Sequence, residues 1–370
     1  MLRKFKVSNF KSFENELILD LSETNGYEFN AKCIKNGIVN NALVYGYNGC
    51  GKSNLGLAIF DIIEHLSDKY REENRYKHYL NAFSSAKYAE FYYEFLINNK
   101  VIKYEYKKTD YKSLLFEKFS IDEEEFVLFD RSKGNHFSVK FKGAETLKNN
   151  IVDNQLSVLK YIKNNTVLVD NSKTKAFNDF FIFIDKMLLF RSLEDRMYLG
   201  LDVGSRALSD DIIDKGNVSD FETFLNEANV KCKLSVVEEL EKKTLVFNFK
   251  DRKIPFFDIY STGTSALTLF YFWFQRIRES NVSFLFIDEF DAFYHHELSA
   301  SIVERLKETG VQFVLTTHNT SNITNDLLRP DCYFLMNNEK IQSLSKSTEK
   351  ELREAHNIEK MYKSGTFDVN

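Results

Sequence analysis

The stretch Gly46-Tyr47-Asn48-Gly49-Cys50-Gly51-Lys52-Ser53 fits the pattern G-x-x-x-x-G-K-[ST] at every fixed position. This pattern is typical of a loop in which glycines allow successive backbone N–H groups to face the phosphate oxygens of a nucleoside triphosphate. In such a loop Lys52 contacts the β- and γ-phosphates, and the hydroxyl of Ser53 binds Mg²⁺. The alternative is a glycine-rich turn that matches the pattern by chance, and the flanking residues decide between the two.

The residues on either side predict the strand and the helix that a phosphate loop needs. Residues 42–45 form a short apolar run suited to a buried parallel strand. Beyond the loop, apolar residues recur at helical spacing, at Leu55, Ile59, Ile62, Ile63 and Leu66. The N-terminus of that helix would point its positive dipole end at the same phosphates. The sequence therefore predicts a nucleotide-binding unit rather than a chance turn.

A second group of polar residues follows an apolar segment near the other end of the chain. Residues 283–287 predict a buried strand that ends in Asp288 and Glu289. A phosphate loop requires an acidic residue at a strand end to hold Mg²⁺, a role that suits Asp288. Glu289 would then lie beside the γ-phosphate and polarise an attacking water. Without the loop, a buried strand followed by an acidic turn would be the better interpretation.

Two further segments add to this set. Residues 311–317 predict another buried strand, which His318 follows. If that strand lies beside the Asp288 strand, His318 shares the edge where ligands of open α/β sheets bind, and it would hydrogen-bond the γ-phosphate and the water. Ser261-Thr262-Gly263-Thr264 precedes an apolar helical pattern over 265–278. Such a turn is either an anion-binding device or an ordinary N-cap.

Composition limits the classes of function. The 370 residues, with 43% hydrophobic and 28% charged side chains, are typical of a soluble protein of two or three subdomains. The net charge of -4 gives no overall positive field, so nucleic-acid binding would need a local patch of basic side chains. One candidate patch, or else a solvated edge, is Arg3, Lys4, Lys6 and Lys11. No run of about 18 apolar residues predicts a membrane span. Four scattered cysteines favour the reducing cytoplasm over a disulfide or zinc framework: Cys33, Cys50, Cys232 and Cys332.

The rest of the sequence predicts a mixed α/β chain with insertions. Residues 91–97 and 101–106 predict a hairpin, and residues 2–10, 17–21 and 245–249 have strand patterns. Helical periodicity predominates over 145–243, where it includes Leu188, and returns over 345–362. We expect five segments: the N-terminal half of the core at 1–66, a β-rich part at 67–143, a helical sensor or partner arm at 144–243, the C-terminal half of the core at 244–345 and a helical tail at 346–370.

The order of these motifs resembles that of the ABC-type ATPases, above all the soluble branch that includes RecF, SMC and OLD proteins. Residues 7–13 (Val-Ser-Asn-Phe-Lys-Ser-Phe) are similar to that branch's N-terminal strand and turn, and residues 48–54 to its N-G-x-G-K-S-N loop. Phe290-Asp291 matches the loop after the catalytic glutamate. The resemblance implies an α/β P-loop NTPase head with a mixed sheet, interrupted by a β-rich and a helical insertion. It implies these nucleotide-binding residues: Gly46, Asn48, Gly49, Cys50, Gly51, Lys52, Ser53, Asn54, Ser261, Gly263 and Thr264.

The resemblance also implies a Mg²⁺-dependent ATP hydrolase. Ser53 and Asp288 would bind the metal ion, and Glu289 and His318 would be catalytic. ABC-type folds bind ATP between two subunits, so the phosphate loop of one chain would face residues 261–264 of another. The expected assembly is a homodimer that ATP closes and hydrolysis releases.

Residues 261–264, 288–291 and 356–362 further resemble the ATPase subunits of bacterial abortive-infection and phage-defence systems. That resemblance implies a cytoplasmic switch or sensor that controls a separate effector, such as a TOPRIM nuclease. A RecF-like repair ATPase that binds DNA directly, and a nucleotide-bound scaffold with negligible turnover, are the alternatives. Two features depart from the family: Ser-Thr-Gly-Thr replaces Leu-Ser-Gly-Gly-Gln, and the glutamine of the magnesium-contacting loop, expected around residues 81–83, is missing.

Overall fold

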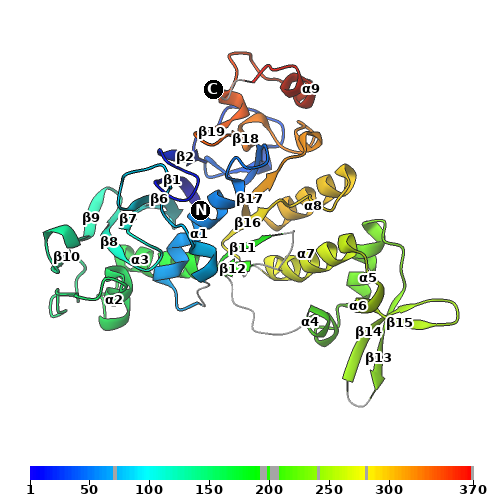
Figure 1. Ribbon diagram of the computed structural model, residues 1–370, viewed down its shortest axis with the longest axis horizontal. Helices are drawn as coiled ribbons and strands as arrows, with labels where there is room; N and C mark the ends of the chain where they lie inside the picture. The colour runs from blue at the N-terminus through cyan, green and yellow to red at the C-terminus, as the bar shows by residue number, and fades with distance from the viewer. Residues whose placement is uncertain (70–72, 192–197, 201–207, 240–241, 280–281, 368–370) are drawn as a thin grey trace.

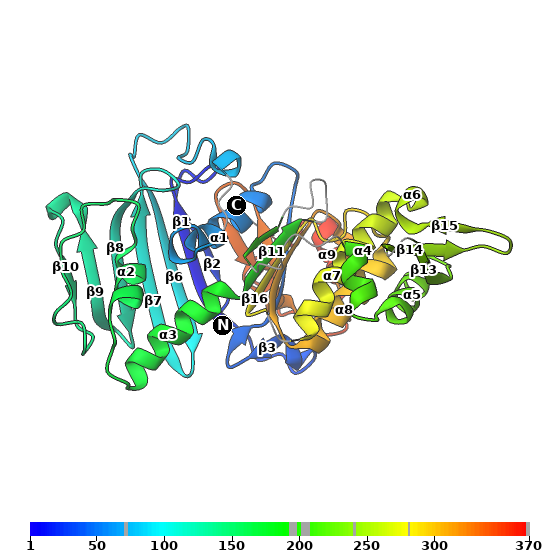
Figure 2. The same cartoon turned by 90° about the horizontal axis from the view of Figure 1, so that it is seen from below.

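The computed structural model describes residues 1–69, 73–191, 198–200, 208–239, 242–279 and 282–367. Its two large sheets face each other across one helix, α1 (Lys52–Leu66), and a third, smaller lobe lies beyond the second sheet. Figure 2 shows this order from left to right: antiparallel sheet, α1, parallel sheet, lobe. The expected α/β class is confirmed.

The first sheet has seven antiparallel strands in the order β10-β9-β8-β7-β6-β1-β2. Buried and half-exposed side chains alternate along its long strands, so one face packs against helices and the other meets solvent. Helices α2 (Val158–Asn165) and α3 (Ser172–Asp185) lie on the packed face together with α1. The predicted hairpin is confirmed as β6 and β7. The strands are β1 (Leu2–Ser8), β2 (Leu17–Asp20), β6 (Ala89–Ile97), β7 (Lys100–Lys108), β8 (Leu114–Ile121), β9 (Glu124–Asp130) and β10 (Phe137–Val139).

The second sheet also has seven strands, in the order β12-β11-β16-β17-β5-β18-β19. The five central strands are parallel and almost continuously buried, as expected for a sheet with both faces covered. Their carboxyl ends therefore lie at one edge. The strands are β5 (Asn41–Gly46), β11 (Met187–Arg191), β12 (Tyr198–Gly200), β16 (Phe284–Asp288), β17 (Gln312–Thr317), β18 (Tyr333–Met336) and β19 (Ile341–Ser343).

Helix α1 is buried on nearly all sides because it packs against both sheets. On the side of the parallel sheet, a Cβ added at Gly56 would come within 2.7 Å of Phe286 Cε1 and 3.0 Å of Leu189 Cδ1. On the other side, the Tyr93 hydroxyl donates to the carbonyl oxygen of Ala58 at 2.9 Å. A glycine at position 56 is thus what lets the helix rest directly on β16 and β11.

A buried ion pair joins α1 to the antiparallel sheet. Lys108 Nζ lies 2.8 Å from Asp61 Oδ2, and both side chains are completely buried. The same carboxylate accepts hydrogen bonds from the hydroxyls of Tyr106 (2.9 Å) and Tyr79 (3.0 Å). A buried charge pair of this kind persists only when its remaining lone pairs are satisfied, and here the two tyrosines satisfy them.

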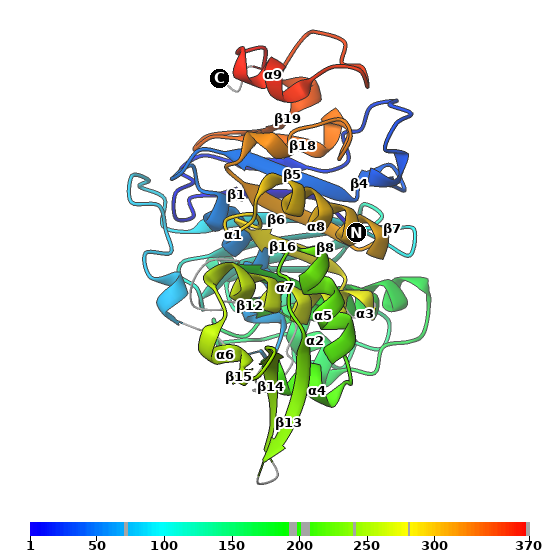
Figure 3. The same cartoon turned by 90° about the vertical axis from the view of Figure 1, so that its right-hand side faces the viewer.

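The expected helical insertion at 144–243 is only partly helical. Strand β11 lies within it and belongs to the centre of the parallel sheet, so the helical interpretation of Leu188 is wrong. The separate lobe begins later and carries a three-stranded sheet whose hairpin projects from the molecule (Figure 3). Its elements are α4 (Leu208–Asp214), α5 (Val218–Glu227), β13 (Leu234–Glu239), β14 (Lys242–Asn248), β15 (Lys253–Pro255), α6 (Phe256–Ile259) and α7 (Thr262–Arg278).

The C-terminal segment is held against the core with little helix. Among the residues described after β19, only α9 (Ile358–Lys363) is α-helical, so the charged pattern over 345–362 predicted too long a helix. The Asn325 amide fixes the preceding turn, donating to the carbonyl oxygens of Arg353 (2.9 Å), Glu354 (3.1 Å) and His356 (3.2 Å). The tail therefore owes its path to side-chain hydrogen bonds rather than to helical periodicity.

Candidate nucleotide-binding site

The phosphate loop connects β5 to α1, as predicted. Figure 1 shows α1 in blue between the strands of the two large sheets. Gly49 and Gly51 have φ angles of 80° and 96°, in the left-handed region that favours glycine. A Cβ added at Gly46 would come within 2.5 Å of Cys50 Sγ and 2.8 Å of the Met336 carbonyl oxygen. All three glycines of the loop are therefore required by the backbone itself, whatever the loop binds.

Lys52 and Asn54 hold the loop to its surroundings. Lys52 Nζ donates to the carbonyl oxygens of Gly46 (2.7 Å) and Tyr47 (3.0 Å), so the ammonium group lies inside the curl of the loop. Asn54 Nδ2 donates to Ser12 Oγ at 2.8 Å, which joins the N-terminal turn to the first turn of α1. Burial raises the pKa of the Cys50 thiol, the opposite of what a reactive thiolate needs.

The two predicted carboxylates lie at the edge where the loop lies. Strands β16, β17 and β5 are adjacent and parallel, so Asp288, Thr317 and Gly46 end at the same side of the sheet. Thr316 Oγ1 donates to Asp288 Oδ1 at 2.8 Å and accepts the backbone N–H of Glu289, also at 2.8 Å. Asp288 is buried, and the neighbouring strand fixes its orientation.

Glu289 has a backbone conformation that is rare for its residue type. Its φ of 48° lies in the left-handed region, which costs on the order of 1–3 kcal/mol for a residue other than glycine. The N–H groups of Glu289 and Phe290 donate to the Thr316 side chain and carbonyl oxygen, respectively. These hydrogen bonds keep the turn in place directly after the strand.

His318 directly follows β17 at this edge and is exposed. Asp291, the second acidic residue after β16, is buried beneath it. It accepts hydrogen bonds from Thr317 Oγ1 (2.8 Å) and Asn322 Nδ2 (2.7 Å). Burial raises the pKa of Asp291 despite these donors. The turn after β16 and the turn after β17 are therefore bound to each other.

Sequence reasoning missed one charged residue of the site, Arg191. It is the last residue of β11 and pairs in register with Asp288. Its Nε lies 3.3 Å from Asp288 Oδ2, and its Nη2 lies 3.6 Å from Glu289 Oε2. The only available signal was an arginine after the apolar run 187–190, which we had assigned to a helical pattern.

The expected replacement for the family's glutamine lies elsewhere. Asn81 is buried, donates to the Lys11 carbonyl oxygen at 2.7 Å and accepts the backbone N–H groups of Phe83 and Ser84. Its side chain is thus fully used in holding its own loop, and the described contact to the carboxylates comes from Arg191 instead. No described contact supports the suggestion that residues 81–83 take the place of the family's glutamine.

Ser261, Gly263 and Thr264 lie at the start of α7 in the lobe. Ser261 is the N-cap: its Oγ accepts the backbone N–H of Thr264 at 3.2 Å and lies 2.9 Å from Thr264 Oγ1. Ser261 is exposed, and a Cβ added at Gly263 would have the Phe293 carbonyl oxygen 3.7 Å away. Among the described residues, no hydrogen bond joins this segment to the phosphate loop of the same chain.

The tail brings a third aromatic ring to the phosphate loop. The Tyr362 ring centroid lies 5.0 Å from that of Tyr45, and its hydroxyl lies 3.5 Å from that of Tyr47. Glu359 Oε1 accepts a hydrogen bond from Thr320 beyond β17. The tail therefore crosses the same edge of the sheet, which the sequence did not predict.

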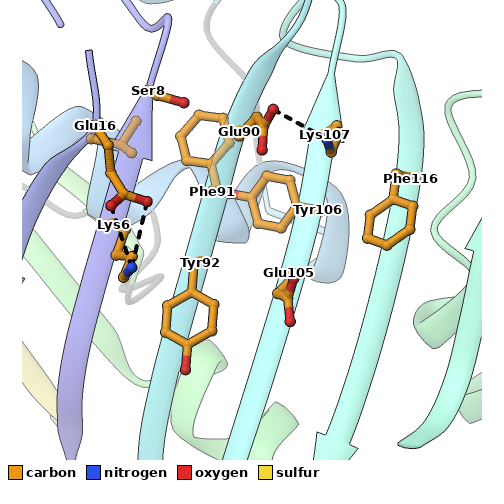
Figure 4. A pocket seen from close by; sticks show the side chains of 11 residues that line it. Lys6, Ser8, Glu16, Glu90, Phe91, Tyr92, Glu105, Tyr106, Lys107 and Phe116 are labelled. Atoms are coloured by element: carbon orange, nitrogen blue, oxygen red, sulfur yellow. Dashed lines mark hydrogen bonds and ion pairs between the residues drawn. The ribbon is translucent and has the colours of Figure 1, made fainter.

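The basic residues near the N-terminus do not form a free patch. Arg3 pairs with Glu94 (2.8 Å), Lys4 with Asp20 (2.5 Å) and Lys6 with Glu16 (3.3 Å), while Lys11 donates to backbone carbonyls. Figure 4 shows part of this region, a cavity of about 210 Å³ on the solvent face of the antiparallel sheet. The charges of its Lys6–Glu16 and Lys107–Glu90 pairs cancel, so this cavity gives no reason to expect an anionic ligand.

The donors at the sheet edge fit Mg²⁺ bound together with phosphates. Within the described ranges, no cluster of three or more His, Cys, Asp or Glu side chains is placed to hold a metal ion. Mg²⁺ in nucleotide sites takes only one or two protein oxygens, because water and phosphates complete its shell. Asp288 Oδ2 is a buried acceptor that receives no hydrogen bond from any described residue. In the same described ranges, no helix is long and apolar enough to cross a membrane.

Comparisons with solved structures give low similarity over nearly the whole chain. The SMC head domain from Thermotoga maritima has 15% identity and a TM-score of 0.43, with 92% of this chain and 98% of that one covered. An SMC head bound to the C-terminal winged-helix domain of ScpA gives 17% identity and a TM-score of 0.45, covering 93% and 97%. An SMC head with an extended coiled coil, bound to a ScpA domain derived from Pyrococcus furiosus, gives 13% and 0.45, covering 93% and 96%.

No curated protein matches the sequence at a significant level. A family model does match, over residues 42–323, which include the phosphate loop, both carboxylates, the lobe and His318. Its description is "AAA domain, putative AbiEii toxin, Type IV TA system". The expected membership of an AAA ATPase family is thereby confirmed, and the chain belongs to the AAA-domain family that carries this description.

Proposed function

We propose that this chain hydrolyses ATP at the carboxyl edge of its parallel sheet. The observation that carries the proposal is that the Gly46–Ser53 loop, after β5, and Asp288 and Glu289, at the end of β16, lie at the same edge of the parallel sheet, with β17 between the two strands. The loop amides and the N-terminus of α1 favour phosphate, and Lys52 lies within the same curl. Ser53 and Asp288 are the proposed protein ligands of Mg²⁺, which would neutralise charge on the phosphates.

Each side chain has a distinct task in the proposed reaction. Lys52 and the loop amides hold the β- and γ-phosphates, and Asp288 orients the metal ion through the carboxylate that Thr316 fixes. Glu289 accepts a proton from the attacking water while the water oxygen forms a bond to the γ-phosphorus. The bond to the β-phosphate oxygen then breaks, releasing ADP and phosphate. His318, exposed beside this edge, donates a hydrogen bond to the γ-phosphate.

The proposed assembly is a homodimer with ATP between the subunits. Its support is the lobe, in which Ser261 caps the 17-residue helix α7 with an exposed N-terminus. That N-terminus suits the phosphates of ATP bound to a second copy. ATP would favour the closed dimer and hydrolysis would release it, so the chain would act as a switch.

The biological role that we propose is control of a separate effector in bacterial anti-phage defence, with a nuclease as the effector. Its support is the family description, which refers to a toxin and a toxin–antitoxin system. Direct binding of DNA, as in a RecF-like ATPase, gains no support from the N-terminal lysines, since acidic side chains or backbone carbonyls pair with each of them.

The decisive experiment is steady-state and single-turnover hydrolysis of ATP by the purified chain with Mg²⁺. Lys52→Ala should abolish nucleotide binding, whereas Glu289→Gln should bind ATP and lose about 10²- to 10⁴-fold in turnover. Light scattering should show a dimer for Glu289→Gln with ATP and a monomer with ADP. Lys163→Ala, an exposed lysine on α2, is the control and should match the wild type. Turnover unaffected by Glu289→Gln would refute the proposed mechanism.

A further inference from the structure

Among the described residues, Arg191 is the cation that forms an ion pair with both Asp288 and Glu289. Register pairing of β11 with β16 sets Arg191 opposite Asp288, so its position follows from the sheet and not from a loop. One guanidinium spans both carboxylates, at 3.3 Å from Asp288 and 3.6 Å from Glu289. Without it, two adjacent negative charges would face each other at this edge.

The contacts leave much of the guanidinium available. Arginine has five N–H donors, and separations of 3.3 and 3.6 Å are longer than the 2.7–2.9 Å of a strong charged hydrogen bond. Arg191 Nε is itself buried, facing Asp288, so the exposed part of the guanidinium is its outer N–H groups. The side chain is 37% exposed, whereas Asp288 is 3% exposed, so the arginine lies on the outer side of the pair.

Helix α1 links the phosphate loop to the strands that carry Asp288 and Arg191. The helix starts at the phosphate loop on β5 and passes over β16 and β11, where Gly56 rests on Phe286 and Leu189. Phe286 and Leu189 each lie two residues before the charged ends of their strands, Asp288 and Arg191. The phosphate loop at the end of β5 and the Arg191–Asp288 pair therefore lie at the same edge of the sheet, with β17 between β5 and β16.

We propose that Arg191 binds the terminal phosphate of ATP and makes the site select triphosphate over diphosphate. The inference rests on the proposed ATPase function and adds the residue that recognises the γ-phosphate. A γ-phosphate brings negative charge close to Asp288 and Glu289, and a neighbouring guanidinium offsets that repulsion with charge-assisted hydrogen bonds. ADP lacks this group and gains nothing from Arg191.

The test measures equilibrium binding of a fluorescent non-hydrolysable ATP analogue and of the matching ADP analogue, both with Mg²⁺. Arg191→Ala should weaken triphosphate binding by about 10- to 100-fold and leave diphosphate binding within about twofold. Arg191→Lys keeps the charge but loses the planar fork of the guanidinium. Its ratio of triphosphate to diphosphate affinity should therefore lie between those of the wild type and Arg191→Ala. Arg305→Ala is the matched control, because Arg305 is similarly exposed and pairs with Glu227 away from the edge.

The outcomes separate this inference from the proposed function. Equal loss of both nucleotides in Arg191→Ala, or an unchanged ratio, would overturn the role of Arg191 while leaving ATP binding intact. A wild-type chain that binds neither nucleotide would overturn both proposals. Thermal unfolding of each variant shows whether the fold is kept. If Arg191→Ala fails to fold, Arg191→Lys is measured in its place and must still lower the preference for triphosphate over diphosphate below that of the wild type.

Discussion

Two carboxylates, Asp61 in helix α1 and Asp288 at the end of β16, each pair with a cation from a strand, but in opposite surroundings. Asp61 and Lys108 are completely buried, 2.8 Å apart, and two tyrosine hydroxyls complete the hydrogen bonding of the acid. Asp288 is as deeply buried, yet its partner Arg191 is 37% exposed and 3.3 Å away. A sealed pair has no route to another partner, whereas the open pair can accept a phosphate or a metal ion. The first pair therefore stabilises the fold, and the second is suited to function.

Breaking the sealed pair should have the largest effect on stability. Lys108→Ala leaves the Asp61 charge buried without a cation, which costs on the order of 3–5 kcal/mol. Urea denaturation at pH 7 measures the loss. The folded fraction should still prefer triphosphate to diphosphate as the wild type does, because Lys108 lies on the side of α1 away from the parallel sheet.

Two variants control this measurement. Lys107→Ala removes the exposed neighbour that pairs with Glu90 at 3.1 Å, and should cost less than about 1 kcal/mol. Adding Asp61→Asn to Lys108→Ala removes the stranded charge and should recover part of the loss. Equal effects of Lys107→Ala and Lys108→Ala would contradict the contrast between sealed and open pairs.

Crowding the apolar side of α1 should have an intermediate effect. Gly56→Ala places a methyl group 2.7 Å from Phe286 Cε1, and overpacking of this kind costs about 1–3 kcal/mol. Thermal or urea unfolding gives the value. Gly26→Ala is the matched control, since an added Cβ there meets no atom within 4 Å and should leave stability unchanged or slightly raised. An unchanged free energy of unfolding in Gly56→Ala would show that β16 and β11 shift to accommodate the added methyl group.

The smallest effect is expected at an exposed pair in the antiparallel sheet. Asp122 lies 2.7 Å from Lys100 Nζ, and the hydrogen bond from this ammonium holds the pKa of Asp122 below its usual value of about 3.9. Because the folded pKa is lowered, the stabilisation is present above pH 4 and is lost as the pH falls through the folded pKa. Asp122→Asn should cost about 0.2–1 kcal/mol at pH 7.

Denaturation of the Asp122→Asn variant at pH 7 and at pH 3 checks the sign of that effect. The difference from the wild type should shrink toward the lower pH. Asp170→Asn serves as the control, since Asp170 is exposed and forms no ion pair in the described part of the chain. A difference that grows as the pH falls would mean that the Lys100–Asp122 pair is not its source.

The parts of the site that lie within one local segment were predictable from sequence. The loop, α1 and the strand before Asp288 follow from glycine spacing and apolar periodicity, and the hairpin at 91–106 follows from alternation. Arg191 was not predictable, because its role depends on β11 lying beside β16, almost 100 residues away in the chain. The run 187–190 is apolar at every position, and so short a run does not distinguish a buried strand from the end of a helix. The path of the tail was missed for a related reason, since Asn325 directs it and helical periodicity does not.

The left-handed backbone at Glu289 has a consequence for how this position trades stability against activity. Glycine would adopt the same φ without a steric penalty, so a chain selected for folding stability alone would carry glycine there. The presence of a carboxylate despite this backbone strain indicates that the turn after β16 is less stable than it would be with glycine, in exchange for a reactive group. Selection for heat resistance alone would thus favour variants that lose Glu289, the side chain that accepts the proton in the proposed reaction.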